Sequence, residues 1–169
     1  MLSVDEALKI VLDTTGVLPA VSRPALEAVD LALDEDIISR ETIPPFTNSA
    51  VDGYAVRSQD VTGASKNNSV VLSVIDCVQA GTVSQKILHE GQAIQIMTGA
   101  PVPGGADAVV MVEQTEKVSA DRVKIFSPPA KNEGVRLAGE DIRMEQTVFQ
   151  KGRVLKPYDI GVLASIGLS

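Results

Sequence analysis

The sequence TIPPF, residues 42–46, marks the point at which the pattern of the chain changes. Two consecutive prolines force an extended path, so this stretch predicts a boundary. Before it, apolar residues repeat with helical spacing. After it, up to about residue 130, short runs of β-type residues alternate with turn residues. The chain is therefore predicted to hold helices at both ends and strands in its middle.

The N-terminal end predicts two helices. Ser3 and Glu6 form the capping-box pattern of a helix that Gly16 ends. Its single apolar stripe consists of Val4, Ala7, Leu8, Val11 and Leu12. A second helix is predicted after residues 22–24, with Leu26, Val29 and Leu33 on its buried face.

The middle of the chain predicts strands separated by loops rich in glycine and proline. The candidate strands are residues 54–56, 70–78, 93–97, 109–112 and 122–126. Further on, residues 147–149 and 154–155 flank a turn and predict a hairpin. Pro157 and Gly167 mark the start and the stop of a final helix.

This order predicts an α+β fold with two subdomains. Residues 1–45 and 142–169 are predicted to pack as one helix-containing subdomain formed by both chain ends. Residues 46–141 are predicted to form an inserted β-rich subdomain, like a β-roll or barrel.

Composition excludes several classes of function. A formal net charge of −7 repels phosphate backbones and anionic lipids, so neither nucleic acid nor a membrane surface is an expected partner. Cys77 is the only cysteine and His89 the only histidine, which excludes an intramolecular disulfide and argues against zinc. His89 is predicted to lie exposed in a turn. The first residues do not resemble a signal peptide and no apolar run is long enough to span a membrane, so we expect a cytoplasmic protein.

Three loops carry residues suited to chemistry, and each also has a plain structural interpretation. In PPFTNSAVDGYAV (44–56), Asp52 is either a site carboxylate or only a turn former. In MTGAPVPGGADAVV (97–110), Thr98 and Gly99 offer a hydroxyl and a free amide to an anion, unless the loop only connects two strands. In VRLAGEDI (135–142), Arg136 suits a phosphate and a carboxylate suits Mg²⁺, unless the loop is a solvated surface.

Together, these three loops and the closing stretch GRVLKPYDIGVLASIG (152–167) resemble the MoeA family over essentially the whole chain. These proteins are the molybdopterin molybdenumtransferases, to which the E domain of gephyrin is also similar. The resemblance implies insertion of molybdate into the dithiolene of adenylylated molybdopterin, with release of AMP and with Mg²⁺ as cofactor. It implies a homodimer joined through the subdomain of the chain ends, with the active site in a cleft between two subunits. An upstream molybdopterin adenylyltransferase is a further expected partner.

By motif match, the resemblance assigns site residues. Asp52, Thr98 and Asp141 correspond to polar residues that the family needs for catalysis, and Asp52 and Asp141 are the expected Mg²⁺ ligands. Ser49, Arg136 and Gly99 are expected to bind substrate.

Family members continue beyond the position of Ser169 into an α/β domain that binds the pterin and then a β domain. We therefore expect the 169-residue chain to be the N-terminal part of such an enzyme and inactive alone. The alternative is a non-catalytic dimerisation or scaffold module. Exposed and clustered site side chains favour the enzyme, whereas scattered or buried ones favour the scaffold.

Overall fold

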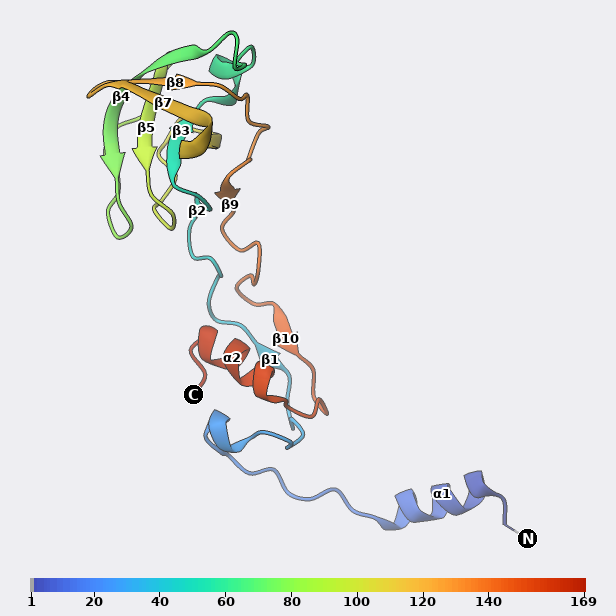
Figure 1. The fold of residues 1–169 in the computed structure, drawn as a ribbon. Coiled ribbons are helices and arrows are strands. Elements are labelled where there is room, and N and C mark those ends of the chain that lie inside the picture. Colours follow the sequence, from blue (N-terminus) through green and yellow to red (C-terminus); the bar gives the residue numbers. More distant parts are fainter. Residues whose placement is uncertain (1) are drawn as a thin grey trace. The chain divides into compact units, whose positions relative to one another are not determined.

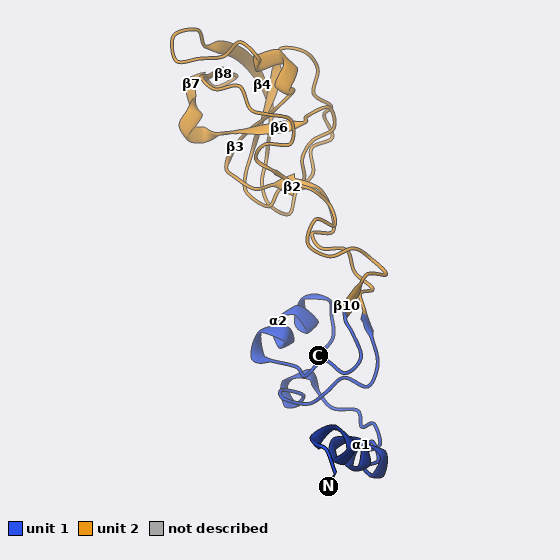
Figure 2. Cartoon of the chain, turned by 90° about the vertical axis from the view of Figure 1, so that its right-hand side faces the viewer, with its two compact units in different colours: residues 1–37, 149–169 blue, residues 38–148 orange. Residues whose placement is uncertain are grey.

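A computed structural model describes residues 2–169, which divide into two compact units (Figure 2). One unit holds the chain up to Ile37 together with Phe149–Ser169, and the other is Ile38–Val148. The units divide the chain at other residues than the predicted domain limits, 45/46 and 141/142, which stay a prediction. Each unit is described by itself below.

The helices and strands of the described residues follow the predicted order, with helices at both ends and strands between them (Figure 1). The helical elements are α1 (Val4–Thr14), α2 (Pro157–Ser165) and the 3₁₀ turns η1 (Ala25–Glu27), η2 (Ser58–Val61) and η3 (Val112–Gln114). The strands are β1 (Ile37–Ile38), β2 (Asn48–Ser49), β3 (Gly53–Val56), β4 (Val70–Val78), β5 (Gln92–Ile96), β6 (Ala108–Met111), β7 (Thr115–Ser119), β8 (Arg122–Ile125), β9 (Val135–Arg136) and β10 (Thr147–Phe149).

The larger unit is built on a curled six-stranded sheet in the order β6-β3-β5-β4-β8-β7. Strands β4 and β5 run parallel and the other neighbours are antiparallel. Apolar side chains cover both faces, because Tyr54 and Val56 join one buried cluster while Ala55 joins the other. Strand β3 is therefore buried on both sides, which holds the loops at its ends in place.

The predicted strands are confirmed to within a residue or two of their ends. Strand β8 shows the predicted alternation, with Val123 and Ile125 buried between more exposed residues. Strand β7, Thr115–Ser119, was not predicted. It is an edge strand whose residues are largely exposed, so its sequence lacks the apolar alternation that marks a half-buried strand.

In the smaller unit, α1 begins with the predicted capping box. The Glu6 amide donates to Ser3 Oγ over 3.2 Å, and the Ser3 amide donates to Glu6 Oε2 over 2.8 Å. The apolar stripe lies on this helix, but none of its residues is buried. Leu8 is 55% exposed and Leu12 is 64% exposed.

The predicted second helix is wrong beyond η1, which ends at Glu27. Asp30 has a φ of +64°, and the backbone from Asp30 onward pairs with residues near the other end of the chain. The Asp30 amide donates to the Leu155 carbonyl over 2.8 Å, and the Leu33 amide donates to the Arg153 carbonyl over 3.0 Å. These long-range bonds replace the bonds of a helix, and Leu26 is left 82% exposed.

The predicted hairpin after residue 146 is also wrong, although the turn at residues 150–153 forms. Strand β10 pairs with β1, and Val154 bridges Ala32. The final helix is confirmed as α2, with Pro157 in its first turn and Gly167 at a φ of +82° just after its end. Because η1 contacts α2, the two ends of the chain meet in one unit, and the predicted α+β class is confirmed.

The remaining expectations on composition concern single residues. His89 is exposed in a turn as predicted, and Cys77 is an exposed free thiol. None of the helices within residues 2–169 is long and apolar enough to cross a membrane.

Candidate functional site

Backbone pairing brings the three predicted loops together in the larger unit. Strand β2 pairs with β9, so Asn48 lies opposite Arg136 of the third loop. On its other side, Ser49 exchanges backbone hydrogen bonds of 2.9 Å with Gly99 and Ala100 of the second loop. The first loop thus lies between the other two, although about fifty and ninety residues of sequence separate them.

Asp52 and Thr98 form a direct pair across the first two loops. The Thr98 amide and the Thr98 hydroxyl both donate to Asp52 Oδ1, each over 2.7 Å. These two hydrogen bonds lower the pKa of Asp52, the amide bond more than the hydroxyl bond, and they keep the carboxylate ionised. Both side chains are exposed. The other oxygen, Oδ2, accepts no hydrogen bond from residues 2–169, and because Asp52 is exposed this oxygen is available to a ligand.

The free amide predicted at Thr98–Gly99 is wrong. The Thr98 amide is used by Asp52, and the Gly99 amide donates to the Ser49 carbonyl. The Ala100 amide also has a partner, the Met97 carbonyl at 3.0 Å. Gly99 has a φ of +80°, which explains the glycine through the turn itself. A role of Gly99 in substrate binding stays a prediction.

Ser49 is nearly fully buried, unlike the other predicted site residues. Its hydroxyl donates to the Val51 carbonyl over 2.6 Å and accepts from the Val51 amide over 3.3 Å. These bonds shape the turn that leads to Asp52. Ser49 therefore supports the site through the backbone, and its predicted contact with substrate stays a prediction.

The third loop holds Arg136 between two carboxylates. Arg136 Nε donates to Glu140 Oε1 over 3.2 Å, and Nη2 donates to Asp141 Oδ2 over 2.5 Å. The Glu140 hydrogen bond and the Asp141 charge raise the pKa of Arg136, so the guanidinium stays charged. The Leu137 amide and Arg136 lower the pKa of Glu140. All three side chains are exposed.

Sequence reasoning assigned Arg136 and Asp141, and it counted Glu140 only as the second carboxylate of the loop. Glu140 is the fourth residue of a turn in which its amide donates to the Leu137 carbonyl. In this turn the Glu140 side chain accepts the Leu137 amide, and because Leu137 follows Arg136 directly, the carboxylate also lies beside the Arg136 side chain.

Asp52 and Asp141 each keep one carboxylate oxygen without a partner in the described chain. Residues 2–169 contain no group of three or more His, Cys, Asp or Glu side chains arranged to hold a metal. Mg²⁺ in phosphate chemistry needs only one or two protein carboxylates, because water and phosphate oxygens complete its shell. Each of the two aspartates keeps one oxygen of the kind that such binding uses, and neither belongs to a closed protein cage within residues 2–169.

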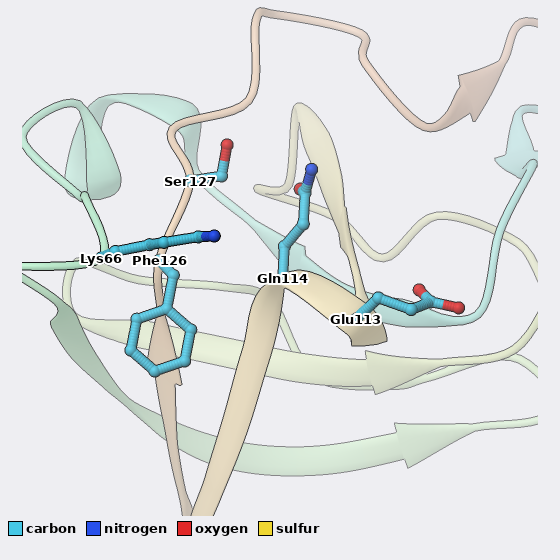
Figure 3. Close-up of a pocket in the computed structure, with 5 residues that line it drawn as sticks. All are labelled: Lys66, Glu113, Gln114, Phe126 and Ser127. Atoms are coloured by element: carbon cyan, nitrogen blue, oxygen red, sulfur yellow. The ribbon is translucent and has the colours of Figure 1, made fainter.

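A pocket of about 610 Å³ opens elsewhere in the same unit (Figure 3). Its lining residues are Lys66, Glu113, Gln114, Phe126 and Ser127. None of them belongs to the predicted site, which is an exposed set of paired polar side chains.

The match to a known family covers nearly the whole chain. Residues 2–167 match the family model MoeA N-terminal region (domain I and II). The chain belongs to this family. The matched region contains all three loops and parts of both compact units.

Relatives of the MoeA family carry names that state an activity. The chain is 41% identical over 164 residues to the molybdopterin molybdenumtransferase of Staphylococcus aureus (strain Mu50), covering 97% of the chain and 39% of that protein. It is 37% identical over 169 residues to molybdopterin molybdenumtransferase 2 of Mycobacterium tuberculosis (strain H37Rv), covering 100% of the chain and 42% of that protein. The chain thus spans about two fifths of the length of these curated relatives.

A solved structure agrees with this membership. The crystal structure of the molybdopterin biosynthesis MoeA protein from Pyrococcus horikoshii OT3 matches with a TM-score of 0.88 at 37% identity. The match covers 97% of the chain and 43% of that protein.

Proposed function

We propose that this chain is the N-terminal part of a molybdopterin molybdenumtransferase and acts in molybdenum cofactor biosynthesis. The reaction is the insertion of molybdate into the dithiolene of adenylylated molybdopterin, with release of AMP. One observation carries the proposal. In a chain that is 41% identical to such an enzyme over 164 residues, Thr98 holds one oxygen of the exposed Asp52 carboxylate and leaves the other without a partner.

The geometry supports separate roles for the paired side chains. Asp52 and Asp141 offer free oxygens to Mg²⁺, which when bound neutralises phosphate charge and orients the reacting groups. Thr98 orients Asp52, and its hydroxyl hydrogen is directed to Oδ1 instead of to molybdate. The catalytic role that we propose for Thr98 is therefore to preorganise the carboxylate.

The exposure of these paired side chains favours the enzyme over the scaffold alternative. Asp52 with Thr98 and Arg136 with Asp141 are exposed pairs on loops joined by β2. A scaffold needs no carboxylate held with one oxygen open.

The first experiment measures molybdate-dependent AMP release from adenylylated molybdopterin. It uses the full-length protein that carries these residues, as wild type, as Asp52→Ala and as Asp121→Ala. Asp121 is a matched control, because it is also an exposed aspartate that accepts a hydrogen bond from a hydroxyl group. Its donor is Ser119 Oγ, at 2.7 Å, and it lies beside β7 at the far edge of the sheet. We expect a fall of roughly 100-fold or more for Asp52→Ala, in the range of a lost electrostatic group, and little change for the control. Full activity of a folded Asp52→Ala protein would overturn the proposal.

We propose further that residues 1–169 are inactive alone, since the named relatives are more than twice as long. Molybdate-dependent AMP release by the 169-residue chain by itself would refute this. The expectations of a cytoplasmic location and of a handover from an adenylyltransferase stay predictions.

A homodimer is part of the proposal, and the apolar stripe of α1 supports it. Val4, Leu8 and Leu12 are between 55% and 84% exposed on a helix that has no buried residue. Apolar area on a capped helix suits burial against a second copy of the chain. We expect Leu8→Gln to weaken self-association in sedimentation equilibrium, while Lys9→Gln, the neighbouring residue on the helix, does not. A chain that is monomeric at all concentrations would contradict the proposed dimer. It would leave the proposed role of Asp52 unaffected.

A further inference from the structure

The larger unit has four turns of one kind, each closed by the side chain of a glutamate or a glutamine. In each, the first residue donates its amide to the side chain of the fourth, and the fourth returns its own amide to the first carbonyl. The four pairs are His89/Gln92, Ala130/Glu133, Leu137/Glu140 and Arg143/Gln146, with side-chain bonds of 2.8–3.0 Å. Because two of the four use glutamine, one acceptor oxygen is enough to close this turn.

Glu140 differs from the other three in what its second oxygen does. Oε2 closes the turn by accepting the Leu137 amide over 2.8 Å, and Oε1 accepts Arg136 Nε. Glu133 makes the same turn bond to Ala130 and makes no ion pair with a described cation. The second oxygen of Glu140 is therefore not needed by the turn, and it orients a guanidinium.

The guanidinium is a rigid plane, so holding Nε fixes the direction of Nη2. Nη2 then meets Asp141 Oδ2 and leaves the other Asp141 oxygen open. Arg136 stands between two carboxylates, and its role in substrate binding stays a prediction. We infer that Glu140 is a positioning residue, which orients the Asp141 carboxylate through Arg136. Only the consequence for activity rests on the proposed function above.

The substitution Glu140→Gln isolates this role. Its single carbonyl oxygen can still accept the Leu137 amide, as Gln92 and Gln146 do in their turns. The side-chain nitrogen of the glutamine then faces Arg136 Nε. Both groups are hydrogen-bond donors, so the bond that orients the guanidinium is lost. Glu133→Gln is the matched control, because it makes the same change in the same turn without an arginine.

The first readout is the hydrogen exchange rate of Arg136 Nε–H, followed by NMR on the 169-residue chain. We expect exchange to be roughly tenfold faster in Glu140→Gln and unchanged in Glu133→Gln. An unchanged rate in Glu140→Gln would overturn the inference whatever the enzyme does.

The second readout is AMP release by the full-length protein as a double-mutant cycle with Arg136→Gln. We expect a loss of roughly tenfold in kcat/KM for Glu140→Gln, the lower end of the effect of outer-shell partners, and none for Glu133→Gln. In the Arg136→Gln background the second substitution should have no further effect. Equal losses in both backgrounds would overturn action through Arg136. If Asp141→Ala leaves AMP release intact, the proposed function fails at this loop, while the exchange rate still decides the positioning contact.

Discussion

Gly53 provides a sharp structural test, because it begins β3 directly after Asp52. It pairs with Ile96 on one side and with Met111 on the other, so strands cover both of its edges. A Cβ added at Gly53 would lie 1.9 Å from the Val110 carbonyl oxygen and 2.8 Å from the Val110 carbonyl carbon. Real Cβ atoms essentially never approach within 3.0 Å, so in Gly53→Ala the two strands must separate by about 1.1 Å at this point.

The obstacle is backbone and cannot be relieved by a change of rotamer. Overpacking against movable side chains costs about 1–3 kcal/mol, so Gly53→Ala is expected to cost more than about 3 kcal/mol. For a chain of this size that lowers Tm by roughly 10 °C. The Asp52 carbonyl accepts the Val112 amide over 3.0 Å, so opening this edge should also disturb the Asp52–Thr98 pair.

The assay is thermal unfolding followed by circular dichroism, with Gly63→Ala as the matched control. A Cβ at Gly63 meets nothing within 4 Å, and its φ is not positive. This control is expected to be neutral or to gain about 0.4–1 kcal/mol through the unfolded state. A Tm for Gly53→Ala within about 3 °C of that of Gly63→Ala would show that the Val110 carbonyl does not obstruct a Cβ at this position.

Two further predictions concern carboxylates. Thr98→Val removes one of the two hydrogen-bond donors to Asp52, so the pKa of Asp52 should rise part of the way toward its ordinary value. An NMR titration of the Asp52 carboxyl carbon measures this pKa, and an unchanged value would contradict the pairing. The stability from ionised Asp52 is present above the unfolded pKa and is lost as pH falls through the lowered native pKa. Asp159→Asn should lower Tm, because the buried Asp159 carboxylate accepts two hydrogen bonds from Arg153 (2.8 and 3.2 Å), and these bonds lower the pKa of Asp159. The difference in Tm between wild type and Asp159→Asn should shrink as the pH falls through that lowered pKa, and a pH-independent difference would argue against the ion pair.

Local signals predicted the elements whose bonds close within a few residues. The capping box of Ser3 and Glu6 predicted α1, and Pro157 with Gly167 predicted α2. The run from Val70 to Val78 predicted β4 to the residue. The exposed edge strand β7 could not be predicted, because its residues show no apolar alternation.

Long-range pairing decided the places where local patterns were misleading. The apolar repeat after residue 24 predicted a helix, but its amides bond near Leu155 and Arg153 instead. The two arms of the predicted hairpin find separate partners, β1 for one and Ala32 for the other. No pattern in a short window contains this information, because the competing acceptors lie more than a hundred residues away.

The same division holds for the candidate site. The candidate side chains could be predicted from the sequence alone, because Asp52, Thr98, Arg136 and Asp141 stand in motifs that can be read along the chain. The partners of these side chains follow from the folded chain: Thr98 donates to Asp52 across 46 residues, the predicted free amide is already used, and Glu140 holds Arg136. This is because a motif specifies its donors and acceptors, whereas the strand pairing that brings the loops side by side specifies which of them meet.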